Sequence, residues 1–120
     1  MRDFRNLEIW KRSHQAVLQI YTATNDFPAT EKFGLTNQIR RAAVSIPSNI
    51  AEGCGHKSKK EFRRYLQIAG ASTSELQYQL ILARDLGYLT KDRYNEIAKV
   101  VEEVKKMIFV FNKRVADSKQ

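Results

Sequence analysis

Apolar residues recur at helical spacing over residues 38–53, and polar residues form a second stripe on the opposite side of the same segment. The apolar stripe, spaced by four, three and four positions, consists of Ile39, Ala43, Ile46 and Ile50. The polar stripe consists of Gln38, Arg41, Ser45, Ser48 and Glu52. A surface helix usually carries mixed Lys and Glu on its outer side, whereas most residues of this stripe are short or hydrogen-bonding, with one Arg near its start and one Glu near its end. We therefore predict a helix from about Leu35 to Glu52 whose apolar face enters the core and whose polar face contacts another helix or another subunit.

Two residues mark irregular points in this helix. Pro47 removes a backbone donor and crowds the carbonyl of Ala43, yet the apolar spacing continues to Ile50, so we predict a kinked helix rather than a broken one. Asn49 and Glu52 are placed to bond backbone groups near Pro47. Gly53 follows the last residue of the pattern, where a helix commonly ends in a left-handed conformation.

A first helix is predicted to begin at Asn6 as its N-cap and to end before Pro28. The residues predicted to face the core are Leu7, Trp10, His14, Val17, Tyr21 and Thr24. Ile9 and Ile20 fall outside this stripe and are predicted to face a second partner. In the connection that follows, Phe27 and Phe33 are predicted to cover the end of the protein, because two exposed aromatic side chains so close together would be unfavourable.

A third helix is predicted from Lys59 to about Leu86. Ser58 and Glu61 have the spacing of a capping box, and Gly87 is a natural C-terminal stop. Its inner side consists of Phe62, Tyr65, Leu66, Ala69, Thr73, Leu76, Leu80 and Ala83. Residues 69–74 are unusually small for a helix interior, which indicates close approach by a neighbouring helix.

A fourth helix is predicted to begin after Thr90 as its cap. Its unbroken heptad stripe consists of Tyr94, Ile97, Val101, Val104, Ile108, Phe111 and Val115. Four helices joined by short connections predict an all-α fold, an antiparallel up-down-up-down four-helix bundle. The length of 120 residues predicts that residues 1–120 form a single domain.

The run over residues 38–53 also resembles the signature of the bacterial four-helix-bundle proteins encoded within 23S rRNA intervening sequences. Further similar positions are Ile20, Tyr21, Phe27, Pro28, residues 31–35, Ser58, Glu61, Phe62, Ile68, Ala69, Ser72, Glu75, Leu76 and residues 86–89. The resemblance covers nearly the whole chain. It implies a small homo-oligomer, with a pentameric ring favoured, and no established catalysis. Accessory proteins of diversity-generating retroelements look like distant relatives, which implies a basic ring that contacts a reverse transcriptase and nucleic acid.

Charge adds a candidate function to this fold. The chain carries 21 Lys and Arg against 13 Asp and Glu, and this net charge of +8 favours polyanionic partners. The densest basic group, with His56 beside it, consists of Lys57, Lys59, Lys60, Arg63 and Arg64. It surrounds the predicted start of the third helix, where free amides and the helix dipole favour an anion, so we predict a nucleic-acid-binding site there. The alternative is a solvated helix start whose lysines maintain solubility.

Two smaller basic groups are interpreted as charged outer faces. They are Arg2, Arg5, Lys11 and Arg12, and Lys105, Lys106, Lys113 and Arg114. No aromatic platform for stacking bases is expected among the lysines, so base specificity should be low.

The sequence contains no catalytic constellation. Glu52 and Glu75 are accompanied by no nucleophile, metal-ligand set or glycine-rich phosphate loop, so we expect no enzyme activity and no cofactor. Arg41 is instead predicted to pair with Glu75 across the second and third helices, or with a carboxylate of a neighbouring subunit. Two scattered histidines do not predict a metal site.

The remaining special side chains are interpreted as structural. His14 and Trp10 are assigned to the core. The lone cysteine, Cys54, is interpreted as inert, excludes an internal disulfide and fits a reducing compartment. No apolar run approaches the ~20 residues of a membrane span, and the N-terminal segment lacks the apolar core of a signal peptide, so a cytoplasmic location without membrane contact is expected.

Two functions remain open at this point. The first is a non-enzymatic homo-oligomer that binds nucleic acid, RNA favoured, through its basic surface. The second is an oligomeric adaptor for another protein, such as a reverse transcriptase or a transposition enzyme, without direct contact to nucleic acid. The adaptor is supported by the polar outer stripe and by the off-stripe residues Ile9, Ile20 and Phe109.

Overall fold

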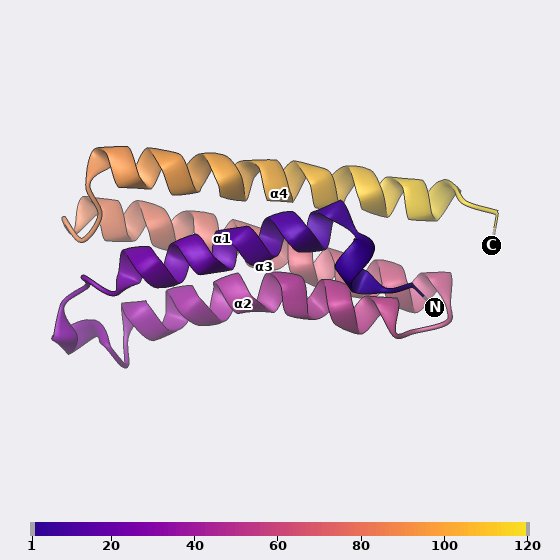
Figure 1. Ribbon diagram of the computed structural model, residues 1–120, viewed down its shortest axis with the longest axis horizontal. Coiled ribbons are helices and arrows are strands. Elements are labelled where there is room, and N and C mark those ends of the chain that lie inside the picture. Colours follow the sequence, from indigo (N-terminus) through magenta and orange to yellow (C-terminus); the bar gives the residue numbers. More distant parts are fainter. Residues whose placement is uncertain (1, 120) are drawn as a thin grey trace.

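The computed structural model describes residues 2–119; Met1 and Gln120, the two ends of the predicted domain, lie outside the described residues. This part of the chain contains four α-helices and no strand. They are α1 (Glu8–Thr24), α2 (Leu35–Cys54), α3 (Lys59–Asp85) and α4 (Lys91–Asp117). Short 3-10 turns, Phe4–Asn6 and Ala29–Glu31, precede α1 and α2. The helices run up-down-up-down in a bundle of 48 × 24 × 20 Å (Figure 1), which confirms the predicted four-helix bundle.

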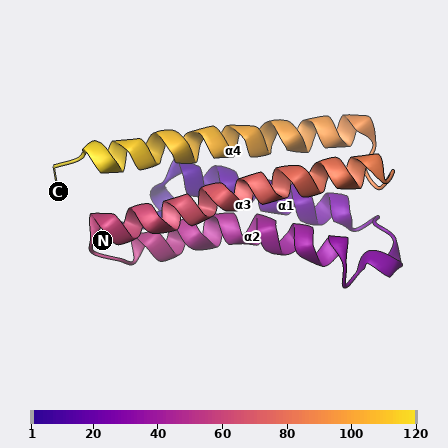
Figure 2. The same ribbon diagram turned by 180° about the vertical axis from the view of Figure 1, so that it is seen from behind.

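Each helix packs against two others around one core. The helix pairs in contact within residues 2–119 are α1–α2, α2–α3, α3–α4 and α1–α4, so the helices stand at the corners of a square (Figures 1 and 2). The largest fully buried side chains include Ile20, Ile39, Ile46, Ile50, Leu66, Leu76, Leu80, Ile97, Val101 and Val104. The predicted core faces of α2, α3 and α4 are therefore correct, with Tyr65, Tyr94 and Phe111 half-buried at the edges. Helix α2 continues through the buried Pro47 without a break, as predicted.

The predicted core face of α1 was wrong by a fraction of a turn. The buried residues of this helix are Ile9, Ser13, Ala16, Ile20, Ala23 and Thr24. Ile9 and Ile20 are 4% and 0% exposed, so neither faces a partner, whereas His14 lies at the surface, stacked on the half-buried Trp10. The core side of α1 uses small residues such as Ser13, whose hydroxyl donates to the Trp10 carbonyl. Because small residues carry little hydrophobic signal, the aromatic residues on the adjoining face dominated the sequence pattern.

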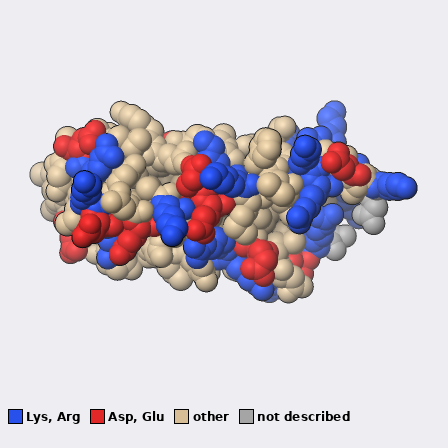
Figure 3. All heavy atoms as spheres, turned by 90° about the horizontal axis from the view of Figure 1, so that it is seen from above, with Lys and Arg blue, Asp and Glu red and all other residues tan. Residues whose placement is uncertain are grey.

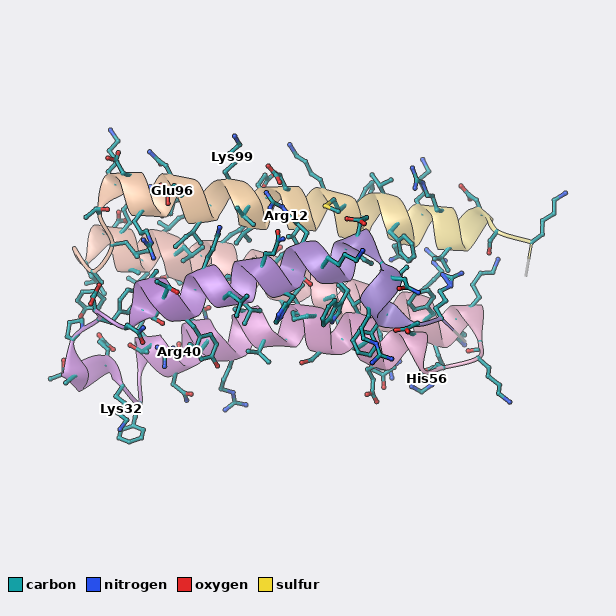
Figure 4. All side chains as sticks on the ribbon, in the orientation of Figure 1. Arg12, Lys32, Arg40, His56, Glu96 and Lys99 are labelled. Carbon is teal, nitrogen blue, oxygen red and sulfur yellow. The ribbon has the colours of Figure 1, made fainter. Side chains whose placement is uncertain are left out.

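Side-chain bonds join α1 to both of its neighbours. Arg12 donates to the Glu103 carboxylate on α4, with a shortest N···O distance of 2.7 Å (Figure 4). Arg40 on α2 donates to the Thr24 hydroxyl at 2.9 Å, and its guanidinium lies over the Tyr21 ring. The predicted cap of α1 was displaced by one residue, because Asn6 belongs to the preceding 3-10 turn and Leu7 occupies the N-cap position.

A second correction concerns the end of the bundle that carries the α1–α2 and α3–α4 connections. Phe27 is buried and packs against Tyr88, but Phe33 is 87% exposed and covers nothing. Glu31, rather than Phe33, joins the two connections at this end of the bundle. Its carboxylate accepts from the Leu35 amide at the start of α2 (3.0 Å) and from the Tyr88 hydroxyl at the other connection (2.9 Å).

Two glycines at helix ends have different roles. Gly87 has a φ of +81° and follows α3, as predicted, and the Tyr88 and Gly87 amides donate back to the Ala83 and Arg84 carbonyls in a Schellman motif. Gly53, predicted to be a helix stop, lies inside α2 and is buried. A Cβ atom there would lie 2.9 Å from Phe62 Cδ1 and 3.0 Å from Tyr65 Cβ. Gly53 therefore allows α2 and α3 to approach each other.

We predict that Gly53→Ala destabilises the protein by about 1–2 kcal/mol, because the added methyl group overpacks the α2–α3 contact by more than the gain in helix propensity returns. Gly70→Ala is the matched control, since a Cβ atom at Gly70 meets only Ile108 Cγ2 at 3.9 Å. That change should stabilise the helix by about 0.5–1 kcal/mol. Urea denaturation measures both effects, and equal changes in the two variants would contradict this account of Gly53.

We also predict that the stabilising effect of Glu31 depends on pH. The Leu35 amide and then the Tyr88 hydroxyl lower the pKa of the Glu31 carboxyl, because both donate to its charged form. A lowered pKa contributes stability that is present above the unfolded-state pKa of about 4.3 and is lost as the pH falls through the folded-state pKa. The difference in Tm between the wild type and Glu31→Gln should therefore be larger at neutral pH than in acid. A difference that grows on acidification would contradict the assignment.

Candidate nucleic-acid interface

Basic side chains gather at the end of the bundle that carries the α2–α3 connection and both chain termini. In Figure 3 Lys and Arg are dense toward this end, on the right, and mix with Asp and Glu toward the other end. Residues 2–8, 52–64 and 110–119 contain ten Lys and Arg against five Asp and Glu. Residues 24–40 and 82–96, at the opposite end, contain five of each sign. The net positive charge of the protein is therefore unevenly distributed along the bundle.

The five predicted cationic side chains lie together at this end, but three of them have partners within the chain. Lys59 Nζ donates to the carbonyls of Ala116 (3.2 Å) and Ser118 (2.6 Å), and so binds the C-terminal end of α4. Arg63 Nε donates to Asn112 Oδ1 on α4 at 2.9 Å. These two cations hold α3 against α4 as well as contributing positive charge.

Arg64 has a more exposed partner on its own helix. It lies 3.2 Å from the Glu61 carboxylate, and this hydrogen bond raises the pKa of the Arg64 guanidinium. Only half of the predicted capping box forms, because Ser58 Oγ accepts from the Glu61 amide while the Glu61 carboxylate turns to Arg64. Such exposed ion pairs are weak, so a phosphate can compete for Arg64.

Lys57 and Lys60 are the accessible members of the group. Both are exposed, and neither has a hydrogen-bond or ion-pair partner within residues 2–119. Lys57 stands beside a small pocket that is also lined by Arg2, His56 and Lys59. Lys60 stands on a shallow trough between α3 and α4 that is also lined by Lys59, Arg63, Arg64, Gln67 and Ala116. A phosphate backbone would meet these two lysines first.

The outer side of α2, predicted to be an interface or a polar network, divides into two parts. Ser45 and Asn49 belong to an internal network: Ser45 Oγ lies 2.9 Å from Ser72 Oγ on α3, and Asn49 Nδ2 donates to the Ser45 carbonyl at 2.7 Å. The bond from Asn49 confirms that it serves backbone close to Pro47. The exposed remainder of the predicted set consists of Gln38, Arg41, Ser48 and Glu52 on α2 and Glu75 on α3.

The predicted ion pair between Arg41 and Glu75 is not formed within residues 2–119. Glu75 instead accepts from Gln79 Nε2 at 3.4 Å. Glu52 makes no side-chain hydrogen bond to the backbone near Pro47 in this part of the chain. The charged members of this surface thus remain available to a partner outside the chain.

Cys54 and His56 are the other candidate residues at this end of the bundle. Burial raises the pKa of the Cys54 thiol, which is 3% exposed, and so disfavours its reactive thiolate form. His56 is stacked on the Tyr65 ring. Residues 2–119 contain no group of three or more His, Cys, Asp or Glu that could hold a metal ion. None of the described helices has the length and apolarity to cross a membrane.

Known proteins resemble this chain in fold and sequence. A crystal structure of a protein with unknown function from the S23 ribosomal protein family of Bacteroides thetaiotaomicron is 26% identical, with a TM-score of 0.79. The likeness covers 88% of this chain and 98% of that one. The comparison with curated proteins produced no match.

A family description extends this likeness over most of the sequence. The model of the 23S rRNA-intervening sequence protein family matches residues 5–110, which include all of α1, α2 and α3 and most of α4. The signature run in α2, the bundle that it helps to build and this match agree with one another. The chain therefore belongs to the 23S rRNA-intervening sequence protein family.

Proposed function

We propose that this protein is a non-enzymatic homo-oligomer, with a pentamer favoured, that binds nucleic acid, with RNA favoured, through the basic end of its bundle. The observation that carries the proposal is the concentration of positive charge around the start of α3. Binding of this kind is driven largely by neutralisation of phosphates and release of counterions. In an assembly, each subunit contributes one such surface, and multivalency strengthens contacts that are individually weak.

The assembly part of the proposal is supported by the exposed side of α2. Gln38, Arg41, Ser48 and Glu52 are polar side chains that can form hydrogen bonds, and they lie exposed in the single chain. Val44 on α2 is also exposed, as is Tyr21 on α1, whose ring lies under the Arg40 guanidinium of α2. Polar groups around an apolar strip are typical of a surface that another subunit covers.

The adaptor alternative has lost much of its support. Ile9 and Ile20, two of the three apolar residues that suggested a protein partner, belong to the core of the bundle. Phe109, the third, remains exposed but stands among lysines. The nucleic-acid proposal therefore accounts for more of the surface.

We predict that Lys57→Glu/Lys60→Glu weakens RNA binding at least about tenfold at low salt and lowers the salt dependence of binding, because phosphate contacts are lost. The measurement is fluorescence anisotropy of a labelled RNA over a series of salt concentrations. Lys57 and Lys60 are preferred to Lys59 and Arg63 because their replacement breaks no bond between α3 and α4.

The matched control is Lys91→Glu/Lys99→Glu, which changes the net charge by the same amount. Both lysines lie on the first half of α4, far from His56, and Lys99 points outward (Figure 4). This control should bind RNA more tightly than the first variant. The proposal fails if the wild type does not bind RNA at low salt, or if both variants lose the same affinity.

We predict from the exposed α2 face that the protein in solution has a mass that is a multiple of its 13.9 kDa chain, five-fold for a pentamer. Arg41→Glu/Ser48→Arg should shift the protein toward the monomer, because it reverses a charge and adds bulk on that face. Light scattering coupled to gel filtration measures the mass, with Lys99→Glu as a surface control. A monomeric wild type at micromolar concentration would refute the assembly.

A further inference from the structure

We propose that Phe109 and the lysines around it on α4 form a stacking platform for the bases of a single-stranded nucleic acid. The trough between α3 and α4 would lead the strand from this platform to the basic start of α3. This inference rests on the proposed nucleic-acid binding. It adds where the nucleic acid binds, that it is single-stranded, and that its bases are recognised by stacking.

Phe109 is unusual for its helix. Its side chain is 72% exposed, whereas its neighbour in sequence, Ile108, is 2% exposed and part of the core. Residues three and four positions apart lie side by side on a helix, so Lys105, Lys106 and Lys113 are the helical neighbours of Phe109, and the first two line the same trough as its side chain. This proposal departs from the sequence-based expectation that no aromatic platform for stacking bases stands among the lysines. An exposed ring bordered by cations is the combination that binds single strands, since the ring stacks on a base while cations meet the phosphates.

The surface beside the ring is an open apolar trough. Its floor and walls include Leu66, Gly70, Ile108 and Val110. Gly70 opens the trough, because it has no side chain and a Cβ atom there would have only Ile108 Cγ2 within 4 Å. Flat bases and apolar sugar faces can lie on such a surface, and polar atoms for their edges stand at its rim in Gln67 and Asn112.

The trough is continuous with the basic cluster. Gln67 lines both the apolar trough and the basic trough of Lys59, Lys60, Arg63 and Arg64. The bond from Arg63 to Asn112 lies at their junction. Along α4 the surface runs from Lys105 to Ala116, roughly 16 Å at the rise of an α-helix. Such a path allows one strand to contact the ring and the cluster together.

The lysines around Phe109 are available to phosphates. Lys113 is exposed and has no partner within residues 2–119. Lys106 lies 3.9 Å from Glu102 in an exposed pair, a contact of low strength that an anion can replace. Lys105 donates to Gln77 Oε1, and the same Gln77 amide donates to the carboxylate of Glu102, which also lines the trough.

Other occupants fit this surface less well. A second copy of this chain has no anionic end to match these lysines, because one end of the bundle is basic and the other is balanced in charge. A helix of a protein partner would need several apolar anchors one turn apart, whereas the trough presents one fully projecting aromatic residue. The bases of a duplex are stacked inside it and cannot reach Phe109. A single strand satisfies both the ring and the charges.

The test compares Phe109→Leu with Phe33→Leu by anisotropy, using a labelled unstructured RNA oligonucleotide, a DNA oligonucleotide of the same length and the corresponding RNA duplex. Phe33 is the matched control, because it is 87% exposed at the opposite end and also stands near a lysine, Lys32. Phe109→Leu keeps an apolar side chain but removes the stacking face. It should lower single-strand affinity about tenfold or more and leave duplex affinity unchanged. Phe109→Trp should restore single-strand binding.

Each contrary result has a distinct meaning. If the RNA strand is bound but Phe109→Leu binds it as the wild type does, or Phe33→Leu weakens it equally, the platform is refuted while the proposed function stands. If the wild type binds only the duplex, the platform is likewise refuted. If the wild type binds no nucleic acid, both proposals fail. Loss of oligomer mass in Phe109→Leu, or loss of binding to an acidic amphipathic peptide without effect on RNA, would assign the surface to a protein contact and overturn the platform.

Discussion

The close approach of α2 and α3 is the constraint on which the rest of the molecule depends. Gly53 admits Phe62 and Tyr65 where a side chain would collide, and Ser45 and Ser72 meet through their hydroxyl groups at mid-height. Small residues let two helices pack closely only if the polar atoms they bring are paired, and the Ser45–Ser72–Asn49 network supplies those partners. This contact fixes α3 against α2, and the bonds from Lys59 and Arg63 then join the start of α3 to the end of α4 at the basic end of the bundle.

Cations at that end have two different uses, which the structure separates. Lys59 donates hydrogen bonds to carbonyls at the C-terminal end of α4, and Arg63 donates one to Asn112 on the same helix. Charge near the C-terminal end of a helix complements its dipole, so this use stabilises the fold. Lys57 and Lys60 remain open to solvent. A cluster that looks uniform in sequence therefore contains cations that bond to α4 and cations without a partner within residues 2–119.

Membership of the 23S rRNA-intervening sequence protein family establishes the fold of this chain but carries little chemistry with it. Four-helix bundles serve many purposes, so function has to be argued from particular surfaces. Here two features bear on function: an uneven distribution of charge along the bundle, and an aromatic ring exposed among lysines on α4. Both lie on the outside of the bundle, where residues are free of the demands of core packing.

The sequence alone determined the helices and most of their inner faces. Two kinds of signal involve only residues close together in the chain and can be recognised without the tertiary structure. They are the regular apolar spacing in α2, α3 and α4 and the helix-end residues Ser58, Thr90 and Gly87. Only the tertiary structure decided which side of α1 faces inward, because Ile9 and Ile20 are the only large apolar residues among those that it buries and the others are small. It also decided that Gly53 is a point of helix contact, that Glu31 joins the two connections at one end, and that Phe109 meets an open trough. These features depend on residues distant in sequence, whose proximity exists only after the helices have packed.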